Sequence, residues 1–558
     1  MTGRAVPVTR DGQDPHARMP AGASIGRSAA LIASLTIAAR LLGLVRTLVF
    51  AKTVGATCLG TAYTTANLVP NIVYDVVLGG ALTSIMVPVL ARPASSAAHD
   101  RAAAREVSQT SSALLTWTVV ILVPVSAAIA VAARPLAGLL YPSNAAIGRG
   151  ACTLQQHAVV TVTGHMLAVF APQILFYGLA VVLYGILQAH RRFAAPAIAP
   201  LVSSLVVIAA YLVFDPFGGS DVAHLSRLSL TAELILAVGT TAGVGTLVVV
   251  ALVPAWRLHI AVRPTLRFPA GIGKRVGGLA VYGIAALITQ DVASLVVVLL
   301  ANGHGYRGAL VLYGYGWQVF EACYAVLAIS VSVSAFPVLA VHEGAEFDET
   351  AASSTRAVLL LSLLGTAVII AIAIPAAHVL ASYPGQVPQL AAGFALFALG
   401  LAGYGLVACL SRVLLAAGRT AAAAVIVSGG WLLVIATDIV LVAQAHGASV
   451  VPLLALGNTV GLTASGLALI VAVSRARGTA PLRGTPRAAI CGAAAAIAGG
   501  AAGAGVAAAL PTAGTIAECF IGLLAVLCAA AAFGVVAWFL DNGDLRAALG
   551  RARRAVSR

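Results

Sequence analysis

Charged residues are scarce in this chain of 558 residues. They make up 9% of it, against 60% hydrophobic residues, and the mean hydropathy is +0.99. Soluble globular proteins do not have this composition, whereas polytopic α-helical membrane proteins do. Runs of alternating polarity, the mark of membrane β-strands, are missing too. The length accommodates about fourteen membrane-spanning helices.

Motifs of enzyme chemistry are also missing. The sequence has no Walker A loop, no HExxH pair and no Asp-rich motif that would hold a metal on a diphosphate. The seven cysteines stand singly, without a CxxC pair, and we expect them to be small core residues. These absences favour a transporter driven by an ion gradient, the membrane potential or a substrate gradient over an enzyme.

Apolar stretches separated by clusters of charge, glycine and proline predict the helices. They cover residues 28–50, 62–91, 108–133, 158–188, 195–214, 230–255, 276–302, 310–340, 355–382, 389–417, 421–444, 449–473, 487–510 and 516–540. The polar first 24 residues lack the apolar core of a signal peptide, so we expect the first helix to be a retained anchor.

The distribution of lysine and arginine predicts the orientation. With the amino terminus in the cytoplasm, 25 of the 33 basic residues fall on the inner side and 5 on the outer side, and Arg40, Arg46 and Arg412 lie inside spans. Cytoplasmic loops of membrane proteins carry such an excess. We therefore predict a plasma-membrane protein with both termini cytoplasmic. The basic residues form no patch with interleaved aromatics, so nucleic acid is not an expected partner.

Two pairs of similar segments indicate an internal repeat. YGLAVVLYGILQAHRRFAAPA from Tyr177 aligns with YGLVACLSRVLLAAGRTAAAA from Tyr404, and LGGALTSIMVPVLA ending at Ala91 aligns with LAISVSVSAFPVLA ending at Ala340. Six helices separate the members of each pair, so the halves share their orientation and are related by an axis along the membrane normal. Chance alignment of Ala/Val/Leu-rich helices is the alternative.

The predicted fold is therefore all-α, with two six-helix lobes and two extra carboxy-terminal helices. Its parts are a basic tail (1–26), an amino-terminal lobe (27–255), a cytoplasmic linker (256–275), a carboxy-terminal lobe (276–473), a cytoplasmic loop (474–486), the extra helices (487–540) and a second basic tail (541–558).

Charged residues inside the first two spans are the strongest functional signal. Arg40 lies roughly 18 Å into a helix that begins near Arg27, close to the bilayer midplane. Arg46 follows on the same helix and Asp75 lies in the next. Such residues usually face a watery cavity or a partner. A guanidinium suits a diphosphate because its planar fork donates two parallel hydrogen bonds. Pairing of one arginine with Asp75 to fix the lobe is the structural alternative.

These segments carry a family resemblance. The runs ARLLGLVR, GATCLGTAY, LVPNIVYDVVLGGAL and SIMVPVLA resemble the opening hairpin of the MurJ (MviN) lipid II flippases, of the actinobacterial type, within the multidrug/oligosaccharidyl-lipid/polysaccharide exporter superfamily. The resemblance implies two six-helix lobes forming a V, and helices 13 and 14 beside a groove for the lipid tail. It also implies that the chain flips a lipid-linked peptidoglycan precursor between leaflets by alternating access.

The resemblance implies a substrate site with Arg40 and Arg46 at its centre. This sequence has Thr61 where better-known members commonly carry an acidic residue, and Asp75 where they carry a basic one. It has Gln318 near the position of an arginine, so its cleft is less cationic. The expected substrate-binding residues are Arg40, Arg46, Thr61, Asn71, Asp75 and Gln318. For Asn71, which follows Pro70, the alternative is a cap at a kink.

A second set of polar residues lies in the carboxy-terminal lobe. Some family members bind sodium there through acidic residues, so the resemblance makes four residues candidate ligands: Asp291, Asp438, Asn458 and Thr459. Oxygen ligands suit a hard cation. A proton-coupled carboxylate and a structural salt bridge to Arg412 are the alternatives.

Three functions compete at this point. The first is a lipid II flippase without a bound cofactor, coupled to Na⁺ or H⁺, whose partners are lipid II, membrane lipids and other cell-wall synthesis proteins. The second is an exporter of another polyprenyl-linked glycan or of a drug. The third is a non-transporting membrane scaffold of cell-wall assembly.

Overall fold

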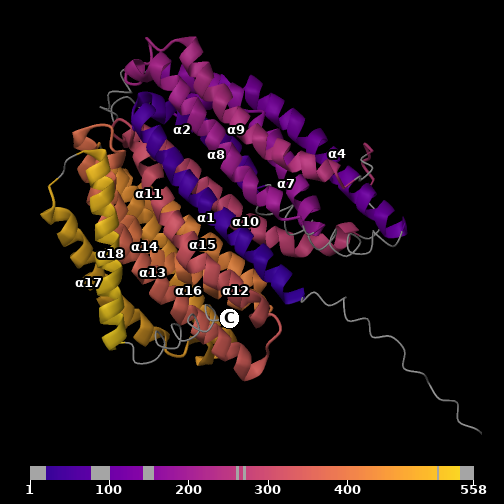
Figure 1. Ribbon diagram of the computed structural model, residues 1–558, viewed down its shortest axis with the longest axis vertical. Coiled ribbons are helices and arrows are strands. Elements are labelled where there is room, and N and C mark those ends of the chain that lie inside the picture. Colours follow the sequence, from indigo (N-terminus) through magenta and orange to yellow (C-terminus); the bar gives the residue numbers. More distant parts are fainter. Residues whose placement is uncertain are drawn as a thin grey trace, which may run out of the picture.

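A bundle of long helices forms the structure, a computed structural model that describes residues 21–76, 101–142, 156–190, 192–258, 263–267, 272–445, 447–511 and 514–540. The amino-terminal lobe contains α1 (Ala21–Thr53), α2 (Cys58–Val76), α4 (Arg101–Val131), α5 (Ala133–Leu139), α6 (Gln156–Phe170), α7 (Gln173–Ala189), α8 (Ala194–Gly218) and α9 (Leu230–Trp256). Figure 1 shows α1 running between this lobe and the rest of the molecule.

The second lobe begins at α10 (Ile272–His304). It continues with α11 (Ala309–Cys323), a π-helical segment (Tyr324–Ile329), α12 (Ser330–Leu339), α13 (Gly344–Leu380), α14 (Val387–Ala416), α15 (Thr420–Val442) and α16 (Val450–Arg477). The extra helices are α17 (Thr485–Ala509) and α18 (Thr515–Leu540), which lie beside α13, at the edge of the second lobe away from the first (Figure 1).

Twelve helical stretches of the described residues are long and apolar enough to cross a membrane. They coincide with the third to fourteenth predicted spans, and α1 and the described part of α2 correspond to the first two. The all-α membrane fold is thus confirmed. Both tails lie wholly or mostly outside the described residues, as does the repeat segment that ends at Ala91.

Several helix boundaries differ from the prediction, and two of the differences have a clear physical cause. The span expected at 158–188 is broken between α6 and α7, where Pro172 has no N–H to continue the helix. The acidic stretch before residue 355, expected to be a loop, is the first part of α13. Packing explains this extension, because Phe347 is buried beneath the Arg477 guanidinium and Asp348 forms an ion pair with it at 3.0 Å.

Equivalent helices pack in the same way in the two lobes. In the first lobe α1 packs on α8, α8 on α9, and α7 on α9; in the second α10 packs on α15, α15 on α16, and α14 on α16. The repeat tyrosines follow this symmetry. Tyr177 of α7 contacts Tyr74 of α2, with ring centroids 4.4 Å apart, and Tyr404 of α14 stacks on Tyr324 at 3.8 Å.

Small residues join the extra helices to the second lobe. A Cβ atom added at Gly503 of α17 would overlap the side chain of Ala371 on α13, and one at Gly499 would stand 2.7 Å from the Ala529 carbonyl oxygen of α18. Close backbone approach of this kind is how helices associate in lipid. We call this contact of α13 with α17 and α18 the glycine seam. Polar contacts hold both of its ends: Arg356 donates to the Arg483 carbonyl oxygen at 2.6 Å, and His378 contacts Glu518 at 3.1 Å.

Candidate functional site

Helix α1 brings its polar side chains to the boundary between the lobes. It packs on α8 of the first lobe, while Thr47 donates a hydrogen bond of 2.6 Å to the side-chain oxygen of Gln318 on α11 of the second. The preceding residue, Arg46, is half-buried at this boundary. The structure therefore brings two predicted site residues, Arg46 and Gln318, to one place.

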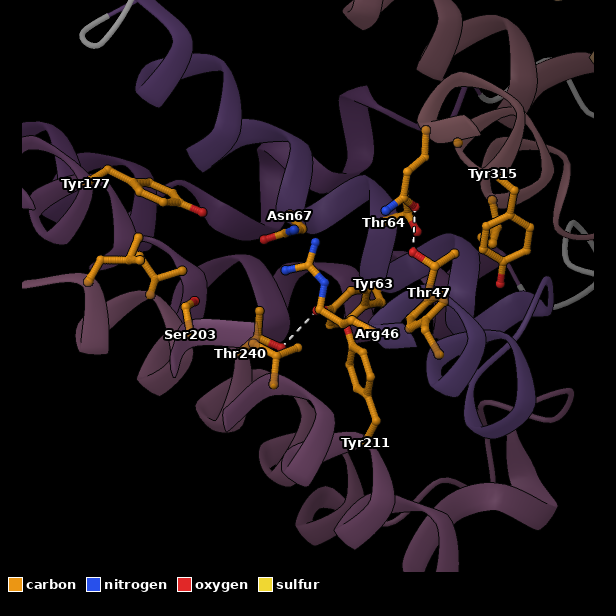
Figure 2. Close-up of a pocket in the computed structure, with 17 residues that line it drawn as sticks. Arg46, Thr47, Tyr63, Thr64, Asn67, Tyr177, Ser203, Tyr211, Thr240 and Tyr315 are labelled. Carbon is orange, nitrogen blue, oxygen red and sulfur yellow. Dashed lines mark hydrogen bonds between the residues drawn. The ribbon is translucent and has the colours of Figure 1, made fainter. Parts of the chain in front are cut away.

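A cavity of about 260 Å³ surrounds the Arg46 side chain. Figure 2 shows the Arg46 guanidinium pointing toward Asn67. Both lobes contribute to the wall: the residues are Arg46, Thr47, Phe50, Tyr63, Thr64, Asn67, Tyr177, Ser203, Val207, Tyr211, Thr240, Val244 and Leu247 from the first lobe, and Val311, Gly314, Tyr315 and Gln318 from the second. The cavity thus lies between the two halves.

Three hydrogen-bonded hydroxyl groups line the cavity next to Arg46. The Tyr63 hydroxyl lies 2.9 Å from both the Tyr211 hydroxyl and the Thr240 hydroxyl, and all three side chains are buried. The positive charge of Arg46 acts on the Tyr63 and Tyr211 hydroxyls. Among the described residues, no carboxylate forms an ion pair with Arg46. The guanidinium is therefore available to an anionic ligand.

Charged side chains of both signs lie along the same boundary, toward the amino-terminal end of α1. Arg40 is exposed, seven residues before Thr47, and its charge acts on Glu321 of α11. Asp75 is also exposed, near the end of the described part of α2, and its electrostatic neighbours include Glu321 and Asp291. Asp75 thus faces carboxylates of the second lobe, and no ion pair with Arg40 or Arg46 is formed among the described residues.

The two remaining substrate candidates lie off the cavity. Asn71 accepts a hydrogen bond of 3.2 Å from Tyr177, one turn beyond the cavity residue Asn67. Thr61 is buried and donates at 2.9 Å to the carbonyl oxygen of Thr57, the residue just before α2. The Thr61 hydroxyl is therefore used at the start of α2.

The structure brings only some of the four candidate cation ligands close together. Asp438 of α15 is fully buried, and neither of its oxygens has a hydrogen-bond partner among the residues that the structure describes. Asn458 of α16, next to the Gly457 against which Asp438 packs, donates to the Tyr313 hydroxyl at 2.8 Å. Thr459 instead donates to the Leu396 carbonyl oxygen of α14 at 2.6 Å.

The two aspartates are at different depths. The backbone bridge between Gly305 and Gly447 sets the register of α10 against α15. Asp291 lies 13 residues, about 20 Å, before the last residue of α10, whereas Asp438 lies 4 residues, about 6 Å, before the last residue of α15. In the described part of the chain, no group of three or more His, Cys, Asp or Glu side chains is arranged to hold a metal ion.

Comparison with known proteins identifies the family. A sequence model of the lipid II flippase MurJ matches residues 50–524. The chain belongs to the MurJ family. Members of this family are lipid transporters and not enzymes, as the missing catalytic motifs predicted.

Relatives of the MurJ family resemble the chain over much of its length. A probable lipid II flippase MurJ of Rickettsia prowazekii is 24% identical over 412 residues, which cover 71% of this chain and 74% of that protein. One of Rhizobium meliloti is 25% identical over 365 residues, covering 64% and 63%.

Solved structures show the same fold. A lipid II flippase MurJ in an inward closed conformation has a TM-score of 0.67 at 16% identity, covering 90% of this chain and 98% of that one. An inward-facing multidrug transporter of the MATE family has a TM-score of 0.56 at 13% identity, covering 79% and 94%. That transporter is described as a member of the MOP superfamily, and its likeness to this chain is one of fold.

Sequence reasoning missed most of the cavity wall. Tyr63 and Asn67 are four residues apart on α2, and Thr240 lies within the polar run GTT of an apolar span; a search for polar residues inside spans finds all three. It also missed that Cys58 is disulfide-bonded, whereas the other five cysteines of the described residues are free. Cys58 is a buried core residue, as expected, but the disulfide gives it a role beyond packing.

Proposed function

We propose that this chain moves lipid II from the inner to the outer leaflet of the cytoplasmic membrane by alternating access, with Arg46 and Arg40 binding the diphosphate. Membership of the MurJ family supports the cargo. Alternating access needs two lobes around a shared site, and the cavity walled by both lobes supplies one.

The observation that carries the proposal is the Arg46 guanidinium. It is half-buried in a cavity between the lobes, without a carboxylate partner among the described residues. A partly desolvated guanidinium stays charged and binds phosphate oxygens through two parallel hydrogen bonds. The family match begins at residue 50, so the roles of Arg40 and Arg46 rest on this geometry and on the helix-1 motif.

Arg40 and the carboxylates would form the approach to the cavity. Arg40 lies about 9 Å nearer the amino-terminal end of α1 than Arg46, a distance that a headgroup can bridge. Since Arg40, Asp75 and Glu321 are exposed while the opposite end of the boundary is buried, we assign this conformation as open toward the amino-terminal end of α1.

Two observations support a cytoplasmic amino terminus. Basic residues are concentrated on that side of the membrane. The disulfide at Cys58 lies at the start of α2, on the opposite face, and disulfides persist in oxidising compartments outside the cytoplasm. In this orientation the open side faces the cytoplasm, where the precursor is made.

We further propose that Asp438 takes up the coupling cation, Na⁺ or H⁺. A buried carboxylate without hydrogen bonds is costly unless a cation or a proton neutralises it. Asn458 is placed to complete such a site, whereas Asp291 lies farther from the carboxy-terminal end of its helix than Asp438 does and Thr459 is turned toward α14.

The test of the proposed function is replacement of an essential flippase. Expression of this chain in a flippase-depleted strain should restore growth and prevent accumulation of inward-facing lipid II. If another lipid-linked glycan or a drug moves instead, the chain is a different exporter of the superfamily. If the protein reaches the membrane and neither growth nor precursor changes, the flippase proposal fails and a scaffold role remains.

A further inference from the structure

Contacts between the lobes gather at the end of the boundary where α1 ends and α2 begins. We call this region the outer seam; it comprises residues 54–57, 302–308 and 382–386. Asn302 of α10 donates to the Thr65 hydroxyl at 3.2 Å and to the Leu140 carbonyl oxygen at 3.0 Å. Ala56, on the turn between α1 and α2, is held by both of its backbone groups.

One side chain holds three backbone segments of the seam together. Gln386, fully buried in the short helix Pro384–Gln386, donates to the Ala56 carbonyl oxygen of the first lobe at 2.8 Å and to the Arg307 carbonyl oxygen at 3.0 Å. Its side-chain oxygen accepts from the backbone N–H groups of Ser382 at 3.0 Å and Tyr383 at 3.3 Å. An amide has two donors and two acceptor positions, so Gln386 is fully satisfied.

Ser382 and Gly308 of the second lobe also contact the Ala56 peptide. The Ala56 N–H donates to the Ser382 hydroxyl at 2.7 Å. Gly308, whose φ is +77°, abuts the same peptide so closely that a Cβ there would overlap the Ala56 carbonyl oxygen. The peptide of Ala56 is therefore enclosed by groups of the second lobe.

From this arrangement we infer that Gln386 is a positioning residue for transport, a latch whose hydrogen bond to Ala56 closes the outer end of the pathway. This inference rests on the proposed function, which places this end of the boundary on the outer side of the membrane and makes the cavity part of a transport pathway. Release of a cargo outward requires the lobes to part at this seam. That parting breaks the bonds to Ala56 and leaves the two bonds to Ser382 and Tyr383, which lie within one lobe, in place.

The chain offers a sharp test. Gln386→Glu keeps the acceptor oxygens that bind Ser382 and Tyr383 and loses the two donors, including the one to Ala56. Gln389→Glu adds the same charge three residues later, and the bond it breaks is the one to the Gly385 carbonyl oxygen in the same lobe. Ser382→Ala is a second variant, which removes the acceptor of the Ala56 N–H without adding charge.

The reporter is Thr64→Cys, at a cavity residue, in a Cys519→Ser background because Cys519 is exposed. The readout is the rate at which this cysteine is labelled. A membrane-impermeant thiol reagent is applied to the outer face of intact cells and to the inner face of inverted vesicles. With Gln386→Glu, labelling from outside should rise at least about fivefold and labelling from inside should fall, since an unpaired buried carbonyl disfavours the closed seam. Ser382→Ala should act in the same direction, and Gln389→Glu should leave both rates unchanged.

Opposite changes at the two faces separate a latch from simple loosening, which would raise both rates. Unchanged labelling with Gln386→Glu and Ser382→Ala, or equal changes with Gln389→Glu, would overturn the latch while leaving complementation by the parent chain intact. A rise at the inner face instead would support the latch and overturn the proposed orientation.

Discussion

Replacement of Arg46 is the most direct test of substrate binding. Arg46→Ala removes a guanidinium that lines a cavity between the lobes and that no described carboxylate neutralises. Hydrogen bonds to charged groups contribute about 1.5–3 kcal/mol. Loss of one bidentate pair to a diphosphate, at about 3 kcal/mol, corresponds to roughly a hundredfold weaker interaction. Arg46→Lys keeps the charge without the fork, so we expect a loss of roughly tenfold.

The assay is growth of a flippase-depleted strain, together with the fraction of lipid II that remains inward-facing, at matched membrane levels of each variant. Lys52→Ala is the control, because Lys52 is an exposed cation on the same helix that does not line the cavity. Full growth and normal lipid II distribution with Arg46→Ala would refute a phosphate-binding role for Arg46.

Three further predictions concern other parts of the molecule. Asp438→Asn should abolish the dependence of transport on the sodium or proton gradient, and a dependence that persists would exclude Asp438 as the coupling site. Tyr63→Phe removes a hydroxyl that bonds Tyr211 and Thr240, so the detergent-purified protein should lose about 1–3 kcal/mol of stability, seen as a lower midpoint of thermal unfolding. Glu518→Ala breaks the contact with His378 and should raise hydrogen exchange in α17 and α18 while leaving α9 unchanged; equal protection in variant and parent would show that the glycine seam alone holds these helices.

Hydropathy predicted the spans well because a lipid-crossing helix must be long and apolar, which is visible in sequence. It failed where tertiary contacts decide the ends of a helix. Phe347 and Asp348 extend α13 beyond the apolar run because Arg477, far away in sequence, packs on one and pairs with the other. A repeat at the level of packing was also predictable, since Tyr177 and Tyr404 occupy matching places in the two lobes.

The site was predictable only in part. Arginine inside an apolar span is conspicuous, and Arg46 indeed lines the cavity. Tyr211 and Tyr315 have no such signal, because tyrosine is common in membrane helices and only the fold shows which ones meet. The offset between Asp291 and Asp438 likewise depends on the register of α10 against α15. Gln386 is far from Ala56 in sequence, and nothing in its neighbourhood indicates that it reaches the other lobe.

The glycine seam between α13 and α17 restricts where a long isoprenoid could lie. A methyl group at Gly503 would already collide with Ala371, so a branched hydrocarbon chain cannot enter between these helices. We therefore expect a polyprenyl tail carried with the headgroup to lie outside the contact between α13 and α17. Such a tail would remain among the membrane lipids while the sugar and phosphate end passes between the lobes.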